Sequence, residues 1–199
     1  MPERNRTLST KRCKRYETGC RRSPLDRCAA KAEQVFILDT DVVSNLRRRQ
    51  PDIALLQWIG AVGWAELATT VTTVMEITFG IEEVRRTNPG VADAVEQWLL
   101  GILGVGEPQV LPLDVEAARM LGRMYAMPPL KRFLVTSPAA RQAKTGADLA
   151  IAAIAISQQA VVATNNVADF LAIQRHFPLP GLLNPFTGEW LVPAVGPGH

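Results

Sequence analysis

The sequence predicts an α/β fold with a mostly parallel central sheet covered by helices on both faces. Short, wholly apolar runs such as Val35–Leu38 alternate with longer amphipathic segments, and such runs are typical of buried parallel strands. The chain has 199 residues, of which 47% are hydrophobic, enough for one well-packed domain. In addition, acidic residues stand where several apolar runs end or begin. Ligands of such folds bind at that edge of the sheet.

The first half of the chain is predicted to hold two strands, each followed by helices. The expected order is strand Val35–Leu38, helix Val42–Arg48, a helix after Pro51, strand Leu67–Val71, helix Val74–Arg86 and helix Val91–Leu103. Pro51 suits a first helical turn, where its missing N–H costs nothing. Asn88-Pro89-Gly90 is a strong helix breaker, so it separates the last two helices.

The second half continues the alternation. The expected order is strand Gln109–Leu113, helix Val115–Tyr125, a helix starting at Asp148, strand Ala160–Thr164, helix Asp169–Gln174 and a candidate fifth strand, Leu182–Leu183. Residues 126–145 contain three prolines, so we expect an irregular, exposed segment there. The segment after Trp190 is rich in Pro and Gly. We therefore expect one domain over residues 35–190 and a loose tail over residues 191–199.

The positive charge of the chain is confined to its first 34 residues. Residues 1–34 carry a net charge of +6, and residues 35–199 carry −3. We expect a disordered basic extension there. It is either an arm that binds phosphates or a tail without a role, and the lack of interleaved aromatic residues favours the tail. A third interpretation is that a GUG start codon at Val35 leaves the extension untranslated, which the intact mass of the native protein would decide.

Cysteine and histidine are too scarce in residues 35–190 for several classes of site. All three cysteines (Cys13, Cys20 and Cys28) lie in the basic extension, so the domain has no catalytic thiol and no disulfide framework. His176 and His199 are the only histidines, which excludes a site built on several histidines. There is no secretory signal and no apolar run near the roughly 20 residues that cross a bilayer, so we expect a cytoplasmic protein.

Carboxylates are therefore the candidate ligands. Asp39 directly follows the first apolar strand, Glu76 lies early in an amphipathic helix, and Asp148 begins a helix of Ala and Ile residues. Carboxylates gathered at one edge repel each other unless a cation holds them together, so we expect a divalent-metal site. Asn166 and Asp169 follow the fourth strand and are either peripheral ligands or a structural capping box. Asp41 or Ser44 is expected to cap the helix after Asp39.

Four segments resemble the motifs of PIN-domain ribonucleases, in particular VapC- and FitB-type toxins of bacterial toxin–antitoxin pairs. The segments, in order, are Phe36–Ser44 (FILDTDVVS), Thr72–Gly80 (TTVMEITFG), Asp148–Ala153 (DLAIAA) and Ala163–Phe170 (ATNNVADF), and Leu183-Asn184-Pro185 resembles the end of the family's domain. The similarity spans residues 35–187. It implies a PIN-like three-layer α/β/α fold for residues 35–190.

The resemblance also implies an activity and its residues. It implies an endoribonuclease that hydrolyses RNA with Mg²⁺ or Mn²⁺ held by Asp39, Glu76 and Asp148, and partners that include an antitoxin and a second copy of the chain. The expected substrate-binding residues are Thr40, Thr164, Asn165, Lys131, Arg132, Arg141 and Lys144. Two departures stand out, because many relatives have Asp at the position of Asn166 and Arg at the position of Asn165. The departure at Asn166 removes a possible ligand of a second metal, unless Asp169 supplies it. The departure at Asn165 removes a possible phosphate contact.

Two alternatives remain open from the sequence. The Asp39-Thr40-Asp41 segment also fits a haloacid-dehalogenase-like phosphatase, with Asp39 as nucleophile and Asp41 as acid/base. That family needs a further paired-acid motif and a placed Lys, whereas Asp148 stands alone. The other alternative is a PIN module that binds RNA or a protein partner without cleaving.

Overall fold

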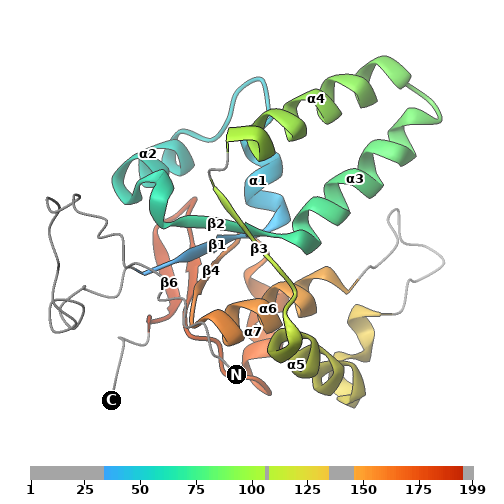
Figure 1. Ribbon diagram of the computed structural model, residues 1–199. Coiled ribbons are helices and arrows are strands. Elements are labelled where there is room, and N and C mark those ends of the chain that lie inside the picture. The colour runs from blue at the N-terminus through green and yellow to red at the C-terminus, as the bar shows by residue number, and fades with distance from the viewer. Residues whose placement is uncertain (1–33, 106–107, 135–145, 195–199) are drawn as a thin grey trace, which may run out of the picture. The chain divides into compact units, whose positions relative to one another are not determined.

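The computed structural model describes residues 34–105, 108–134 and 146–194, which form a six-stranded sheet with the strand order β3-β2-β1-β4-β5-β6 (Figure 1). The strands are β1 (Phe36–Leu38), β2 (Leu67–Thr70), β3 (Gln109–Leu111), β4 (Val161–Ala163), β5 (Leu182–Asn184) and β6 (Glu189–Val192). The first five pair in parallel, and β6 is an antiparallel edge strand. The predicted α/β fold with a mostly parallel sheet is confirmed.

Seven α-helices and two short 3-10 helices are present in the described residues. They are α1 (Thr40–Leu46), α2 (Ile53–Val62), η2 (Trp64–Glu66), α3 (Val71–Arg85), α4 (Pro89–Val105), α5 (Val115–Ala126), η3 (Pro128–Phe133), α6 (Ala147–Gln158) and α7 (Val167–Gln174). None of the helices in this part of the chain is long and apolar enough to cross a membrane.

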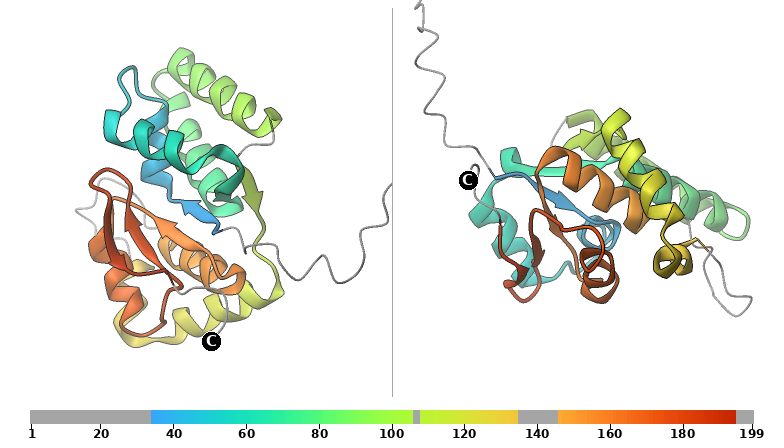
Figure 2. Two further views of the ribbon diagram at one scale, coloured as in Figure 1. Left: turned by 90° about the vertical axis from the view of Figure 1, so that its left-hand side faces the viewer. Right: turned by 90° about the horizontal axis from the view of Figure 1, so that it is seen from below.

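The helices form two layers, one on each face of the sheet (Figure 2). Successive side chains of a strand point to opposite faces. In β1, Ile37 accordingly packs with residues of α5, α6 and α7, whereas Phe36 and Leu38 pack with residues of α1 to α4. The helix α6 is buried along almost its whole length, which explains why its sequence is nearly all Ala and Ile. The fold is thus a three-layer α/β/α arrangement.

The topology places the ends of β1 and β4 side by side. From β1 the chain builds outward through β2 to β3, then returns to place β4 on the other side of β1. The register pairs Leu38 with Ala163, so the residues that follow these two strands are neighbours although about 125 positions separate them. A point where the direction of strand order reverses is where parallel α/β sheets bind ligands.

The structure differs from the sequence prediction at some boundaries. Leu191 and Val192, expected in a loose tail, belong to β6, whose Trp190 ring packs near Phe36. The segment after Ala126, expected to be irregular and exposed, contains η3 with Leu130 and Phe133 buried. The expectations for residues 1–33, Arg141, Lys144 and residues 195–199 lie outside the described part of the chain.

Candidate functional site

Asp39 lies at the centre of the site. It follows the buried residue Leu38 and is itself only 3% exposed. One carboxylate oxygen, Oδ1, accepts a 2.7 Å hydrogen bond from the backbone N–H of Thr40. The other, Oδ2, accepts a 2.7 Å bond from the hydroxyl of Thr164, which follows β4. Both oxygens are therefore oriented, one by the start of α1 and one by the neighbouring strand.

The capping residue of α1 differs from the prediction. We expected Asp41 or Ser44 to cap this helix, but Asp39 is the N-cap residue. Asp41 instead lies in the first turn, and its Oδ2 accepts a 3.0 Å hydrogen bond from the backbone N–H of Asn165. Asp39 can cap the helix and still belong to the site because a carboxylate has two oxygens with several lone pairs.

Glu76 reaches the same region from α3. Its Oε2 atom accepts a 2.7 Å hydrogen bond from the hydroxyl of Thr40. Thr40 therefore joins two acids, because its backbone N–H bonds Asp39 and its side chain bonds Glu76. The start of α3 is fixed by Thr70, whose hydroxyl accepts the backbone N–H of Thr73 at 3.1 Å.

Asp148 comes from the first turn of α6 and is linked to the loop after β4. The side-chain amide of Asn166 donates to Asp148 Oδ2 at 3.3 Å and to Asp169 Oδ2 at 3.2 Å. Asn166 occupies the N-cap position of α7 but makes no side-chain capping bond, so the capping-box interpretation of Asn166 and Asp169 is wrong. The amide instead holds two carboxylates that would otherwise repel each other.

The predicted substrate-binding residues lie at different distances from these acids. Thr40 and Thr164 are within hydrogen-bonding distance of them, as described. Asn165 is exposed, and its side-chain oxygen accepts a 3.3 Å bond from Asn184 on β5. Arg132 is exposed on η3 and forms a 3.1 Å ion pair with Asp169, next to Lys131. Asp169 thus links Arg132 of η3 to Asn166, which in turn donates to Asp148.

Burial and neighbouring acids disfavour the charged form of Asp39. Its pKa is raised well above the usual 3.8, first by burial and then by the negative charges of Asp41 and Asp148. The hydrogen bonds from Thr164 and Thr40 oppose this shift. Burial also raises the pKa of Asp41. The site therefore favours any ligand that brings positive charge.

The donor set fits a hard divalent cation, although the described residues contain no ready-made group of three Asp, Glu, His or Cys side chains that could hold a metal ion. The side chains of Asp39, Glu76 and Asp148 offer only oxygen atoms, the donors that Mg²⁺ and Mn²⁺ prefer. The Oδ1 atom of Asp41 is buried and has no hydrogen-bond partner among the described residues. A buried acceptor without a partner lowers the free energy of unfolding unless a hydrogen-bond donor or a cation binds it.

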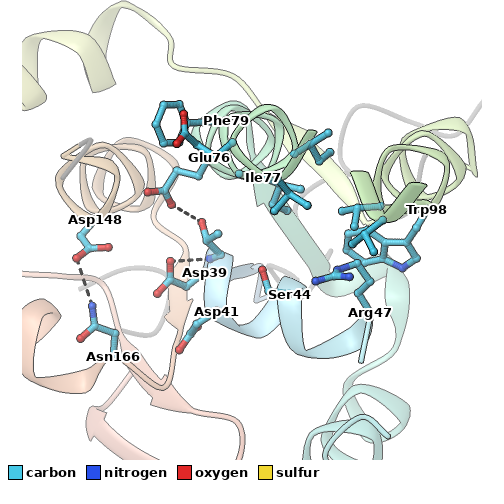
Figure 3. Close-up of a pocket in the computed structure, with 17 residues that line it drawn as sticks. Asp39, Asp41, Ser44, Arg47, Glu76, Ile77, Phe79, Trp98, Asp148 and Asn166 are labelled. Atoms are coloured by element: carbon cyan, nitrogen blue, oxygen red, sulfur yellow. Dashed lines mark hydrogen bonds between the residues drawn. The ribbon is translucent and has the colours of Figure 1, made fainter. Parts of the chain in front are cut away.

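These acids line one end of a cavity of about 750 Å³ (Figure 3). Asp39, Asp41, Glu76, Asp148 and Asn166 all contribute to its wall. In Figure 3 these acids lie together on one side of the cavity, with Asn166 linked to Asp148. The sequence identified four of these five residues as site candidates. It did not place Asp41 in the wall of this cavity, because its position two residues after Asp39 suggested a helix cap.

The chain matches two curated relatives over most of their length. It is 30% identical over 140 residues to the plasmid stability protein StbB of Pseudomonas syringae pv. tomato, which covers 69% of this chain and 92% of the relative. It is 32% identical over 148 residues to the VapC ribonuclease Y4jK of Sinorhizobium fredii, which covers 69% of this chain and 91% of the relative. No family model matches the chain.

Solved structures show the same fold. FitAcB from Neisseria gonorrhoeae matches with a TM-score of 0.54 and 23% identity, over 76% of this chain and 99% of that one. VapBC from Salmonella typhimurium, bound to DNA, matches with a TM-score of 0.51 and 20% identity, over 73% of this chain and 93% of that one.

Proposed function

Because this chain belongs to the VapC- and FitB-type PIN-domain toxins, we propose that it is a metal-dependent endoribonuclease of a toxin–antitoxin pair. The observation that carries this proposal is the position of Asp39, Glu76 and Asp148. These acids come from the end of β1, from α3 and from α6, and they line one cavity. The relative from S. fredii, named a ribonuclease, supports RNA as the substrate.

Asp39, Glu76 and Asp148 are the proposed ligands of Mg²⁺ or Mn²⁺, with Asn166 and Asp169 at the periphery. A bound divalent cation lowers the pKa of a water molecule and offsets negative charge on a phosphate. Burial and the negative charges of Asp41 and Asp148, which raise the pKa of Asp39, support the binding of such an ion.

The other residues of the site position these ligands and the RNA. Thr40 and Thr164 orient carboxylate oxygens through their hydroxyl groups. Asn166 holds Asp148 and Asp169 together. We further propose that Lys131 and Arg132 on η3 attract the RNA backbone towards the acids. The same role is proposed for Arg141 and Lys144, which lie outside the described residues.

Three further parts of the proposal concern where the protein acts and with which partners. FitAcB and VapBC are the assemblies in which the structurally similar chains occur, and this supports an antitoxin as a partner. We also propose that the chain forms a homodimer and acts in the cytoplasm, as the family resemblance implies.

The test is cleavage of a structured RNA pool by the purified protein with Mg²⁺, with Mn²⁺ and with EDTA. Cleavage should require a metal and should disappear in Asp148→Ala and Glu76→Gln, because each loses a proposed ligand. Glu82→Gln is the matched control. Glu82 lies on the same helix, is exposed and pairs with Arg85, so this variant should cleave like the wild type.

Two results would contradict the proposal. Cleavage that persists in both Asp148→Ala and Glu76→Gln would place the reaction elsewhere. Metal-dependent RNA binding without cleavage, with a range of RNA pools, would favour the non-catalytic module instead. The relatives and the solved structures give the phosphatase alternative no support. Covalent capture of beryllofluoride at Asp39 would be its signature.

A further inference from the structure

The cavity that contains the acids continues to a second, chemically different end. Its wall also includes Trp98 and Val95 of α4, Ile81 and Val84 of α3, and Arg47, which directly follows α1. In Figure 3 the acids lie on one side of this cavity and Arg47 and Trp98 on the other, with Ser44 between them. One continuous space therefore joins an acidic end to an aromatic end.

The aromatic end has the chemistry of a nucleotide site. Trp98 is half-buried, so part of its ring is accessible. Among the described residues that line the cavity, Arg47 is the only cation, and its exposed guanidinium can face a phosphate. Glu83 also lines the cavity, but its carboxylate is paired with Arg86 at 3.0 Å. Proteins that bind single-stranded nucleic acids use this combination: a base stacks on the aromatic face, and the guanidinium contacts the phosphate backbone.

We propose that the Arg47–Trp98 end of the cavity binds one nucleotide of the RNA next to the scissile phosphate. The base packs against Trp98, and Arg47 faces a phosphate of the same strand. This inference rests on the proposed ribonuclease function, because the acidic end defines where the scissile phosphate lies. The whole cavity, acidic end included, has a volume of about 750 Å³, within the roughly 300–1,000 Å³ range of sites that enclose small ligands.

The test uses the full chain labelled with 5-fluorotryptophan and observed by ¹⁹F NMR. The chain has four tryptophans, and single Trp→Phe variants assign their signals. Adenosine, cytidine, guanosine and uridine 5′-monophosphate are the probes, with ribose 5-phosphate as the base-free control. At least one nucleotide should shift the Trp98 signal, and ribose 5-phosphate should not. Trp190, exposed on β6, is the internal control and should not respond.

A variant tests the charge contribution. Arg47→Gln should raise the dissociation constant of the nucleotide, read from the Trp98 signal during titration, roughly 5- to 10-fold, because one charged contact is lost. A Trp98 signal that responds to no nucleotide, or equally to ribose 5-phosphate, would overturn the proposal. In that case an apolar segment of the antitoxin is the better occupant of this end.

The subsite and the proposed function can fail separately. If the protein cleaves RNA with metal but Trp98 ignores the nucleotides, the subsite is wrong and the ribonuclease function stands. If nucleotides shift Trp98 but no RNA is cleaved under any metal, the nucleotide site stands and the ribonuclease function is wrong.

Discussion

Asp39 shows how one side chain can serve both the fold and the site. Its two oxygens accept bonds from Thr40 and Thr164, which tie the start of α1 to the end of β4. These bonds favour the charged carboxylate, whereas burial and the charges of Asp41 and Asp148 oppose it more strongly. A buried carboxylate held in a charged form against such opposition lowers the free energy of unfolding of the metal-free protein.

Asp39→Asn should therefore stabilise the protein in EDTA at pH 7. The asparagine carries no charge, keeps an acceptor for Thr40, and lets the Thr164 hydroxyl accept instead of donate. A gain of about 1 kcal/mol would raise the thermal midpoint by about 2–4 °C in a protein of this size. Thermal unfolding followed by circular dichroism measures this difference. Saturating Mg²⁺ should stabilise the wild type and leave the variant unchanged.

The advantage of Asp39→Asn should depend on pH in a defined direction. The raised pKa means that the folded state keeps the Asp39 proton to higher pH than the unfolded chain, whose carboxyl titrates near 3.8. The loss in free energy of unfolding that ionised Asp39 causes is therefore absent below about pH 4 and grows as the pH rises above that value. The two proteins should have similar midpoints near pH 4. A variant that is less stable than the wild type at pH 7 in EDTA would contradict this account.

The sequence predicts the acids of the site better than the contacts between them. Asp39, Glu76 and Asp148 are recognisable because each stands beside a strongly apolar segment whose position in an α/β sheet is predictable. The hydrogen bond between Asp41 and the backbone of Asn165 cannot be recognised in the sequence, because it depends on the register of β1 against β4. Tertiary register of this kind leaves no periodic signal in the sequence.

At the scale of elements, the junction between β2 and α3 offers a sharp contrast between two neighbouring threonines. Thr69 and Thr70 are both buried. The hydroxyl of Thr69 has no hydrogen-bond partner among the described residues, whereas the hydroxyl of Thr70 caps α3 through Thr73. The sequence prediction started this helix at Val74, three residues late, because the capping role of Thr70 was not recognised.

Valine at these two positions should have opposite effects. Thr69→Val replaces an unpaired buried hydroxyl by a methyl group of similar shape, so it should raise the free energy of unfolding by about 1 kcal/mol. Thr70→Val removes a cap and should lower it by about 1 kcal/mol. Urea denaturation of both variants measures the difference. Equal losses in the two variants would show that the Thr69 hydroxyl has a partner in solution.

At the scale of the whole molecule, strand order explains why distant residues form one site. The chain returns from β3 to place β4 beside β1, and this brings the residues after both strands to one edge of the sheet. The helices α3 and α6, one on each face, then deliver Glu76 and Asp148 to that edge. Every described residue of the site and of both cores lies between Val35 and Val192.

Removal of residues 1–33 should therefore weaken RNA binding without changing the stability of the fold. The described part of the chain already holds the sheet and both cores, so we expect the midpoint of unfolding and the metal requirement of cleavage to match those of the full chain. Residues 1–34 carry a net charge of +6 and the remaining chain carries −3, so the shortened protein should bind RNA more weakly at low salt.

The difference between the two proteins should shrink as salt rises, because counterions screen the contribution of the basic residues. RNA binding measured by anisotropy at several salt concentrations gives the two slopes, and thermal unfolding gives the two midpoints. A lower midpoint in the shortened protein would mean that the extension contributes to the fold. Identical salt slopes would mean that its charge does not reach the RNA, as expected of a tail without a role.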